Sequence, residues 1–213
     1  MNIKVVSKIL ESNDRLAESN NQRLKAAGIY TINLMGAPGA GKTSVLERVI
    51  TTLKDTLRVG VIEGDIVGSE DAQRISALDV PVVQINTGGA CHLDANMISE
   101  VLDSMPLDSL DILIIENVGN LVCPAEFKVG EDIKVMVLSV TGGHDKPLKY
   151  PLMFRESTAL LLNKVDLLPY IDVDIDRALR DALSINPAIK IFKTSCKTRD
   201  GIGDFCTWLK GLR

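Results

Sequence analysis

The stretch Gly36–Thr43 reads GAPGAGKT, and its pattern decides the fold. It matches the motif G-x-x-x-x-G-K-S/T without a mismatch. An apolar run precedes it at residues 30–35, and apolar residues recur at helical spacing over residues 44–57. Glycines in such a loop let consecutive backbone N–H groups converge on one anion at the N-terminus of the following helix. The chain is therefore predicted to bind a nucleoside triphosphate.

Two side chains of this loop are predicted to act directly on the nucleotide. Lys42 is expected to reach the outer phosphates and is therefore a catalytic candidate, and the Thr43 hydroxyl is expected to ligate Mg²⁺. The predicted nucleotide-binding residues in this region are Gly36, Ala37, Pro38, Gly39, Ala40, Gly41, Lys42, Thr43 and Ser44.

Short apolar runs alternate with helical patterns along most of the chain. The predicted strands cover residues 30–35, 59–63, 80–85, 111–116, 133–140, 159–163 and 189–194. The predicted helices cover residues 44–57, 69–78, 93–104, 173–184 and 202–212. Short, continuously apolar strands are typical of parallel sheets that helices cover on both faces. We therefore predict an α/β fold with a doubly wound, mostly parallel sheet flanked by helices, which binds ligands at the carboxyl ends of its strands.

A further helix is predicted at the N-terminus. Apolar residues recur over residues 5–27, and Gly28 ends the pattern. Because this segment is polar around residues 19–22, we expect it to pack against the edge of the domain or against a partner. The predicted organisation is an N-terminal helix at residues 1–27 and a single P-loop domain at residues 28–213.

Composition narrows the class of protein. A chain of 213 residues is long enough for one domain with a sizeable core. A net charge of −4 argues against a nucleic-acid partner. No apolar run approaches the roughly 20 residues that cross a bilayer, and the N-terminus lacks the apolar core of a secretory signal. We expect a cytoplasmic protein without a membrane partner, whose four cysteines are reduced thiols.

The sequence Asn163-Lys164-Val165-Asp166 directly follows a predicted strand and indicates which base is bound. The Asp166 carboxylate can accept two hydrogen bonds from guanine, whereas adenine offers no matching pair of donors. We expect the Lys164 stem to lie over the base and Asn163 to tie this loop to the phosphate loop. The chain is therefore predicted to bind GTP and GDP and to be a GTPase.

A second loop is predicted on the guanine side. Ser195, Cys196 and Lys197 follow the last predicted strand and resemble the loop that buttresses guanine in GTPases, with cysteine in place of the usual alanine. A small apolar thiol suits that place, so Cys196 is interpreted as structural.

The Mg²⁺ ion of a GTPase needs an acidic partner, and two candidates are present. Asp65 follows the second predicted strand, and Glu116 ends the fourth. Either carboxylate could hold Mg²⁺ or its water, and both are catalytic candidates. The segment from Glu116 to Gly119 resembles the D-x-x-G switch, in which the Gly119 N–H is expected to sense the γ-phosphate. No glutamine stands in the usual water-positioning place after it, so slow intrinsic hydrolysis is predicted.

A group of thiols and imidazole suggests a second chemistry. Cys91 and His92 are adjacent at the start of a predicted helix, where a cysteine pKa is lowered, and Cys123 follows the switch. These are ligands for Zn²⁺, Ni²⁺ or Cu⁺. Three ligands leave a tetrahedral site one short, so one hypothesis is a site shared by two copies. The alternative is two buried cysteines in loops. Cys206 is predicted to lie in the core, and His144 at the surface.

The chain resembles the HypB family, the GTPases of nickel–iron hydrogenase maturation, from Ala26 to its C-terminus. The matching segments are GAPGAGKTS, EGDIVGSEDAQRI, NTGGACHLDANM, ENVGNLVCPAEFKVGE, LSVTGGHDKPLKYP and LLNKVDLLPY. The resemblance implies a nickel-handling metallochaperone with Mg²⁺, a GTP-favoured homodimer, and Ni²⁺ or Zn²⁺ at an interface site of Cys91, His92 and Cys123. The implied partners are a HypA-type zinc protein and, indirectly, the hydrogenase large subunit.

Two features depart from the family pattern. Many bacterial members carry an N-terminal C-x-x-C-G-C motif or a histidine-rich stretch. The sequence begins MNIKVVSKILESN and contains neither, so high-affinity nickel storage is not expected of it. Gly143 and His144 also stand where the family has acidic residues, and the imidazole is either an extra ligand or local variation.

Two rival functions share part of this pattern. A urease-type nickel accessory GTPase typically has Cys-Pro-His where this chain has Cys91-His92. A GTPase switch without metal cargo would use its cysteines for packing alone. Under the metallochaperone reading, Cys123 lies four residues beyond Gly119, so hydrolysis is expected to move Cys123 and change the affinity of the metal site.

Overall fold

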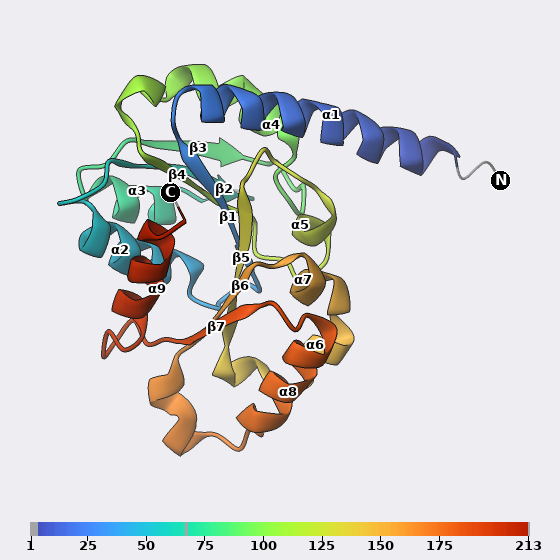
Figure 1. Cartoon of the computed structure of the whole chain (residues 1–213), viewed down its shortest axis with the longest axis vertical. Helices are drawn as coiled ribbons and strands as arrows, with labels where there is room; N and C mark the ends of the chain where they lie inside the picture. Colours follow the sequence, from blue (N-terminus) through green and yellow to red (C-terminus); the bar gives the residue numbers. More distant parts are fainter. Residues whose placement is uncertain (1–3, 67, 213) are drawn as a thin grey trace.

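One parallel sheet organises the structure, a computed structural model that describes residues 4–66 and 68–212. Its seven strands lie in the order β3-β2-β4-β1-β5-β6-β7 (Figure 1). All strand pairs are parallel. The strands are β1 (Tyr30–Gly36), β2 (Val59–Asp65), β3 (Val82–Asn86), β4 (Ile112–Glu116), β5 (Ile133–Ser139), β6 (Ala159–Asn163) and β7 (Lys190–Lys193). The predicted α/β, doubly wound fold is confirmed, and each predicted strand end lies within two residues of the observed one.

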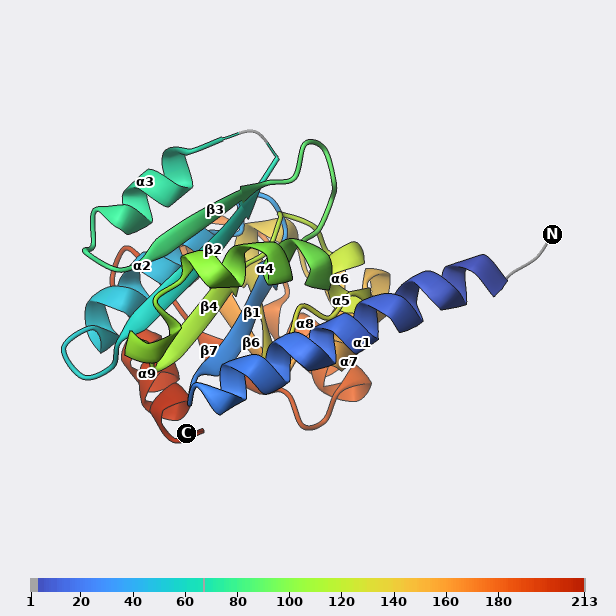
Figure 2. The same ribbon diagram turned by 90° about the horizontal axis from the view of Figure 1, so that it is seen from above.

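Helices cover both faces of this sheet. One face carries α2 (Lys42–Leu53), α3 (Glu70–Ser76) and α9 (Ile202–Lys210). The other carries α1 (Lys4–Ala26), α4 (Ala95–Val101), α5 (Cys123–Glu126), α7 (Pro151–Glu156) and α8 (Ile175–Ile185), with α6 (Lys146–Lys149) beside α8. Figure 2 shows the two layers of helices from above. The 3₁₀ turns are η1 (Leu102–Ser104), η2 (Leu107–Ser109), η3 (Val140–Gly142) and η4 (Val165–Tyr170).

The prediction missed the shortest helices and displaced several helix starts by one or two residues. Helices α5, α6 and α7 have four to six residues, too few to establish a period of 3.6. The helix expected from residue 93 begins at Ala95, because the Asp94 side chain accepts a hydrogen bond from Met97 N and caps it. Cys91 and His92 therefore lie in the loop before α4 instead of opening the helix.

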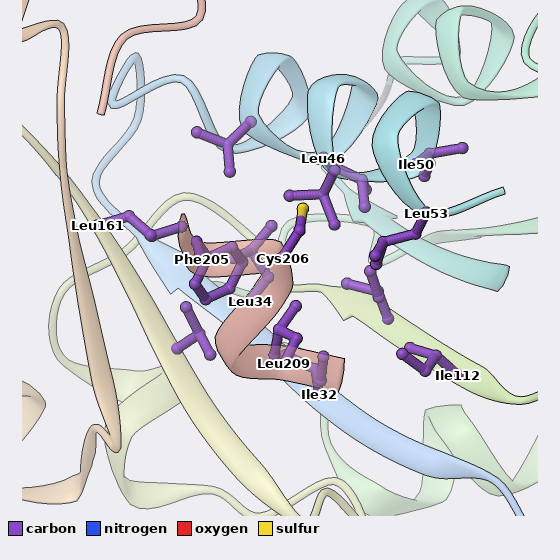
Figure 3. Close-up of a cluster of buried hydrophobic side chains, with 14 of the residues drawn as sticks. Ile32, Leu34, Leu46, Ile50, Leu53, Ile112, Leu161, Phe205, Cys206 and Leu209 are labelled. Atoms are coloured by element: carbon purple, nitrogen blue, oxygen red, sulfur yellow. The ribbon is translucent and has the colours of Figure 1, made fainter. Parts of the chain in front are cut away.

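The core between the sheet and α2 and α9 contains one cysteine, as predicted. Figure 3 shows Cys206 among Leu46, Phe205 and Leu209, and its side chain is 2 % exposed. Burial raises the pKa of the Cys206 thiol to about 11. Cys206 is therefore an inert packing residue.

The N-terminal helix contacts the domain through its polar stretch as well as its apolar residues. Leu24 is fully buried in the layer beneath α4, and Asn20 is 3 % exposed. Gly130 passes so close to α1 that a Cβ there would lie 2.7 Å from Asn20 Cβ. Helix α1 thus packs across the face of the domain, whereas only an edge or partner contact was expected, and its first turns extend past the domain (Figure 2). The division into an N-terminal helix and one domain stays a prediction.

Across residues 4–66 and 68–212, no helix combines the length and apolar character needed to cross a membrane.

Candidate functional site

The phosphate loop (Gly36–Thr43) connects β1 to α2 at the carboxyl end of the sheet. A Cβ at Gly36 would overlap the Val137 carbonyl oxygen of the neighbouring strand. Gly41 has φ 93° and precedes α2, and a Cβ there would lie 2.6 Å from Asn163 Nδ2. Both glycines are therefore needed for the close approach of this loop to its neighbours.

The loop after β6 binds directly to the phosphate loop. Asn163 Nδ2 donates a hydrogen bond to Ala40 O at 3.0 Å, and Lys164 Nζ donates to Gly39 O at 2.8 Å. Asn163 is 1 % exposed, so its hydrogen bond is protected from water. The first bond is the link that the sequence predicted for Asn163.

The loop after β7 holds the Asp166 carboxylate. The buried Ser195 hydroxyl donates to Asp166 Oδ1 at 2.6 Å and accepts from Lys197 N at 3.2 Å. The Cys196 carbonyl accepts from Arg48 Nε at 3.0 Å, and burial raises the pKa of the Cys196 thiol. The residues predicted for guanine binding are therefore joined in one network with α2.

Two glutamates meet beside the phosphate loop, and only one of them, Glu116, was predicted from the sequence. Glu63 of β2 and Glu116 of β4 are register partners on adjacent strands, and each is 3 % exposed. Thr43 Oγ1 donates to Glu116 Oε1 at 2.8 Å. Within the described residues, Oε2 of both glutamates has no hydrogen-bond partner. Buried carboxylates with free oxygens and a threonine hydroxyl fit a hard cation such as Mg²⁺.

The electrostatics of this pair follow from burial. Burial, and then the charge of Glu116, raise the pKa of Glu63 to about 8. Burial also raises the pKa of Glu116 to about 7, against the opposing effect of Lys42. A divalent cation would stabilise both carboxylates in their charged form. The only signal for Glu63 in the sequence is an acidic residue inside an apolar strand, VGVIEGD at residues 59–65.

Asp65, the other predicted acid, is used differently in this structure. Its Oδ1 accepts from Ile66 N at 2.7 Å, and its Oδ2 accepts from Gly68 N at 2.9 Å. Both carboxylate oxygens of Asp65 therefore accept backbone hydrogen bonds after β2. In Glu63, by contrast, Oε2 has no hydrogen-bond partner among the described residues.

The predicted soft-metal ligands come together in one group. Cys91 Sγ lies 3.1 Å from Cys123 Sγ and 3.6 Å from His92 Nδ1. The ligand atoms of all three residues lie within 4.8 Å of one another, a spacing that a single ion can bridge. Cys91 is exposed and both cysteines are free, so the alternative of two buried cysteines does not hold.

Burial and neighbouring groups shift the pKa values of two members of this group. Neighbouring Cys91 and burial raise the pKa of the Cys123 thiol, although Cys123 opens α5. Burial lowers the pKa of His92, which favours the neutral imidazole that binds metals. The His92 ring stacks on Phe127 with centroids 4.0 Å apart, which fixes its orientation. His144 is not in this group; its Nε2 lies 3.5 Å from Arg177 Nη1.

The switch segment that joins the two sites runs against the phosphate loop. A Cβ at Gly119 would lie 3.0 Å from Pro38 Cα, so glycine favours this close approach. Asn120 forms an isolated bridge with Gly36, and the soft-metal ligand Cys123 follows three residues later. The predicted nucleotide and metal residues are therefore neighbours in space.

Several known proteins are similar to this chain in sequence and in structure. The family model described as CobW/HypB/UreG, nucleotide-binding domain, matches residues 30–193. The hydrogenase maturation factor HypB of Escherichia coli K12 is 47 % identical over 211 residues, which are 99 % of this chain and 73 % of that protein.

Two crystal structures are similar along nearly their whole length. HypB from Archaeoglobus fulgidus has a TM-score of 0.89 at 38 % identity, covering 95 % of this chain and 98 % of that one. HypB from Helicobacter pylori in complex with nickel has a TM-score of 0.88 at 37 % identity, covering 94 % of each chain. The chain belongs to the HypB family of hydrogenase maturation factors.

Proposed function

We propose that this protein hydrolyses GTP to GDP and phosphate and uses that cycle to carry nickel during hydrogenase maturation. The observation that carries the proposal is a three-ligand soft-metal group linked through Asn120 to the phosphate loop. A GTPase switch without cargo would have no use for two thiols and an imidazole within 4.8 Å of one another.

In the nucleotide site, each side chain has a distinct task. Lys42 and the backbone N–H groups of the phosphate loop bind the phosphates, and Asp166 binds guanine. Thr43 and Glu116 would hold Mg²⁺ together with Glu63, and Asp65 would bind its water. When bound, the ion supplies positive charge for the phosphates. Because no glutamine follows Gly119 in the water-positioning place, we expect slow hydrolysis in the absence of a partner.

In the metal site, the cargo is Ni²⁺, and Zn²⁺ is the competing ion. The sulfur atoms of Cys91 and Cys123 and the neutral imidazole of His92 are the proposed ligands. Three ligands from one chain leave a coordination position open, which a second copy would fill in a homodimer that GTP favours. The exposed apolar residues Ile66 (46 %) and Val122 (50 %) lie next to Asp65 and Cys123 and support a contact there.

The proposed partners follow from family membership. The nickel would pass between this protein and a HypA-type zinc protein and would reach the hydrogenase large subunit indirectly. This exchange needs reduced thiols, as they occur in the cytoplasm. The nickel complex of the Helicobacter pylori relative supports nickel as the cargo.

The test combines size-exclusion chromatography with elemental analysis. Protein is loaded with GDP or a non-hydrolysable GTP analogue and with Ni²⁺ or Zn²⁺. We expect a dimer favoured by the analogue, with about one metal ion per two chains, and loss of that metal in the Cys91→Ser and Cys123→Ser variants. A monomer without metal in every state would contradict the metallochaperone function and leave a switch.

A further inference from the structure

A single asparagine, Asn120, lies where three functional segments meet. Its backbone N–H donates to Gly36 O of the phosphate loop at 3.0 Å. Its side-chain Nδ2 donates to Cys91 O at 3.2 Å, and its Oδ1 accepts from Val122 N at 2.8 Å. Through one residue, the start of the phosphate loop is thus hydrogen-bonded to the segments that carry both thiols.

The chain just before Asn120 is held in place by buried hydrogen bonds, so Gly119 and Asn120 can move while the end of β4 does not. Asn117 is fully buried, its Nδ2 donates to Asn33 Oδ1 at 3.1 Å, and its Oδ1 accepts from Leu93 N at 2.9 Å. Gly119 then packs against Pro38 of the phosphate loop. A change at the phosphates would therefore act on Gly119 and Asn120 while the end of β4 stays fixed.

A second asparagine, Asn13, is hydrogen-bonded near both ligand segments but not to the phosphate loop. Asn13 of α1 accepts from Ala95 N at 3.0 Å through Oδ1 and donates to Lys128 O at 2.9 Å through Nδ2. Ala95 follows His92 by three residues, and Lys128 follows Cys123 by five. Asn13 therefore braces both ligand segments, but its hydrogen bonds do not reach the phosphate loop.

We infer that the Asn120 side chain is a positioning residue that transmits the nucleotide state to the soft-metal site by holding the Cys91 and Cys123 segments to the same switch. The inference rests on the proposed function. When the switch moves, a bond to each segment moves both sulfur atoms together. Without the side chain, only Cys123 follows the switch through the backbone, and the Cys91 segment is released from it.

The experiment measures Ni²⁺ affinity by competition with a chelator, for protein bound to GDP and to a non-hydrolysable GTP analogue. Coupling between sites typically changes affinity about 5–150-fold, and we expect the wild type to fall in that range. In Asn120→Ala, where only Cys123 still follows the switch, the ratio of the two affinities should fall several-fold from the wild-type value toward 1. Asn120→Asp keeps the acceptor for Val122 N and loses the donor to Cys91 O, so it should give an intermediate ratio and serves if the alanine variant does not fold.

Asn13→Ala is the matched control. Its loss should weaken Ni²⁺ binding by a similar factor in both nucleotide states and leave the ratio at the wild-type value. The thiolate-to-nickel charge-transfer absorption should persist in the Asn120 and Asn13 variants, because all three ligands remain.

The outcomes separate this inference from the proposed function. If Cys123→Ser binds Ni²⁺ as the wild type does, the proposed metal site is wrong. If Cys123→Ser loses the metal but Asn120→Ala keeps the wild-type ratio, the metal site stands and the role of Asn120 is wrong. A wild type with equal affinity in both nucleotide states would also overturn the role of Asn120.

Discussion

The nucleotide site and the soft-metal site differ in how completely one chain builds them. The nucleotide side rests on buried polar residues, with Glu63, Glu116, Asn163 and Ser195 all at most 3 % exposed. The metal side is shallow, with an exposed Cys91 and three ligands. A site that must hold its ligand through a reaction benefits from burial, because electrostatic interactions are stronger there. A site that must release an ion to a partner needs an open side.

The largest expected effect is a loss of GTP hydrolysis without a change in metal binding. In Lys42→Ala, the phosphates lose their main side-chain cation, so we expect single-turnover GTP hydrolysis to fall about 100-fold or more. Ni²⁺ binding in nucleotide-free protein should stay unchanged, because Lys42 is not part of the ligand group. A variant with wild-type hydrolysis would contradict the assignment of Lys42.

A smaller effect tests the base specificity of the same side. In Asp166→Asn, the charged acceptor for guanine is lost, and hydrogen bonds to charged groups contribute about 1.5–3 kcal/mol. We expect GDP affinity, measured by calorimetry, to fall about 10- to 100-fold, since each 1.4 kcal/mol is tenfold. Xanthosine diphosphate, which presents an acceptor where guanine has its amine, should bind the variant better than GDP does. Unchanged GDP binding would exclude the predicted guanine contact.

A pair of cysteine variants separates metal ligation from packing. Cys123→Ser should lose Ni²⁺ affinity by at least tenfold, because a hydroxyl replaces a soft ligand. Cys206→Ala should bind Ni²⁺ normally and lose about 1 kcal/mol of unfolding free energy, because it leaves a small cavity beside Leu46 and Phe205. Elemental analysis and denaturant unfolding measure the two effects. The reverse pattern would place the metal elsewhere.

The smallest effect concerns the pH dependence of the metal-free protein. Glu63 has a pKa of about 8 in the folded state, above the ordinary glutamate value of 4.5, so the folded protein holds more protons between these pH values. The unfolding free energy should therefore fall as the pH rises from about 5 to about 8. Glu63→Gln should reduce this slope and raise stability at pH 8. Urea unfolding at several pH values measures it, and an unchanged slope would argue against the buried carboxyl.

Short sequence motifs predicted the nucleotide-binding residues, but not the contacts between distant segments that hold those residues in place. GAPGAGKT and NKVD are contiguous, so the sequence reveals them directly. The burial of Glu63 depends on the register of β2 with β4, and no short motif reports that pairing. The bonds of Asn120 to Gly36 and Cys91 join segments that are far apart in the chain. The same holds for the proximity of Cys91 to Cys123, which the family resemblance implied and spacing alone did not.

The central claim is that nucleotide binding and Ni²⁺ binding are energetically coupled, and thermodynamic linkage offers the most direct test. If the nucleotide state changes Ni²⁺ affinity, Ni²⁺ must change the affinity for the GTP analogue, relative to GDP, by the same factor. Both affinities are measured by calorimetry with and without saturating Ni²⁺. The account predicts a change of at least about fivefold in the ratio of analogue to GDP affinity. A ratio that Ni²⁺ leaves unchanged would contradict the coupling.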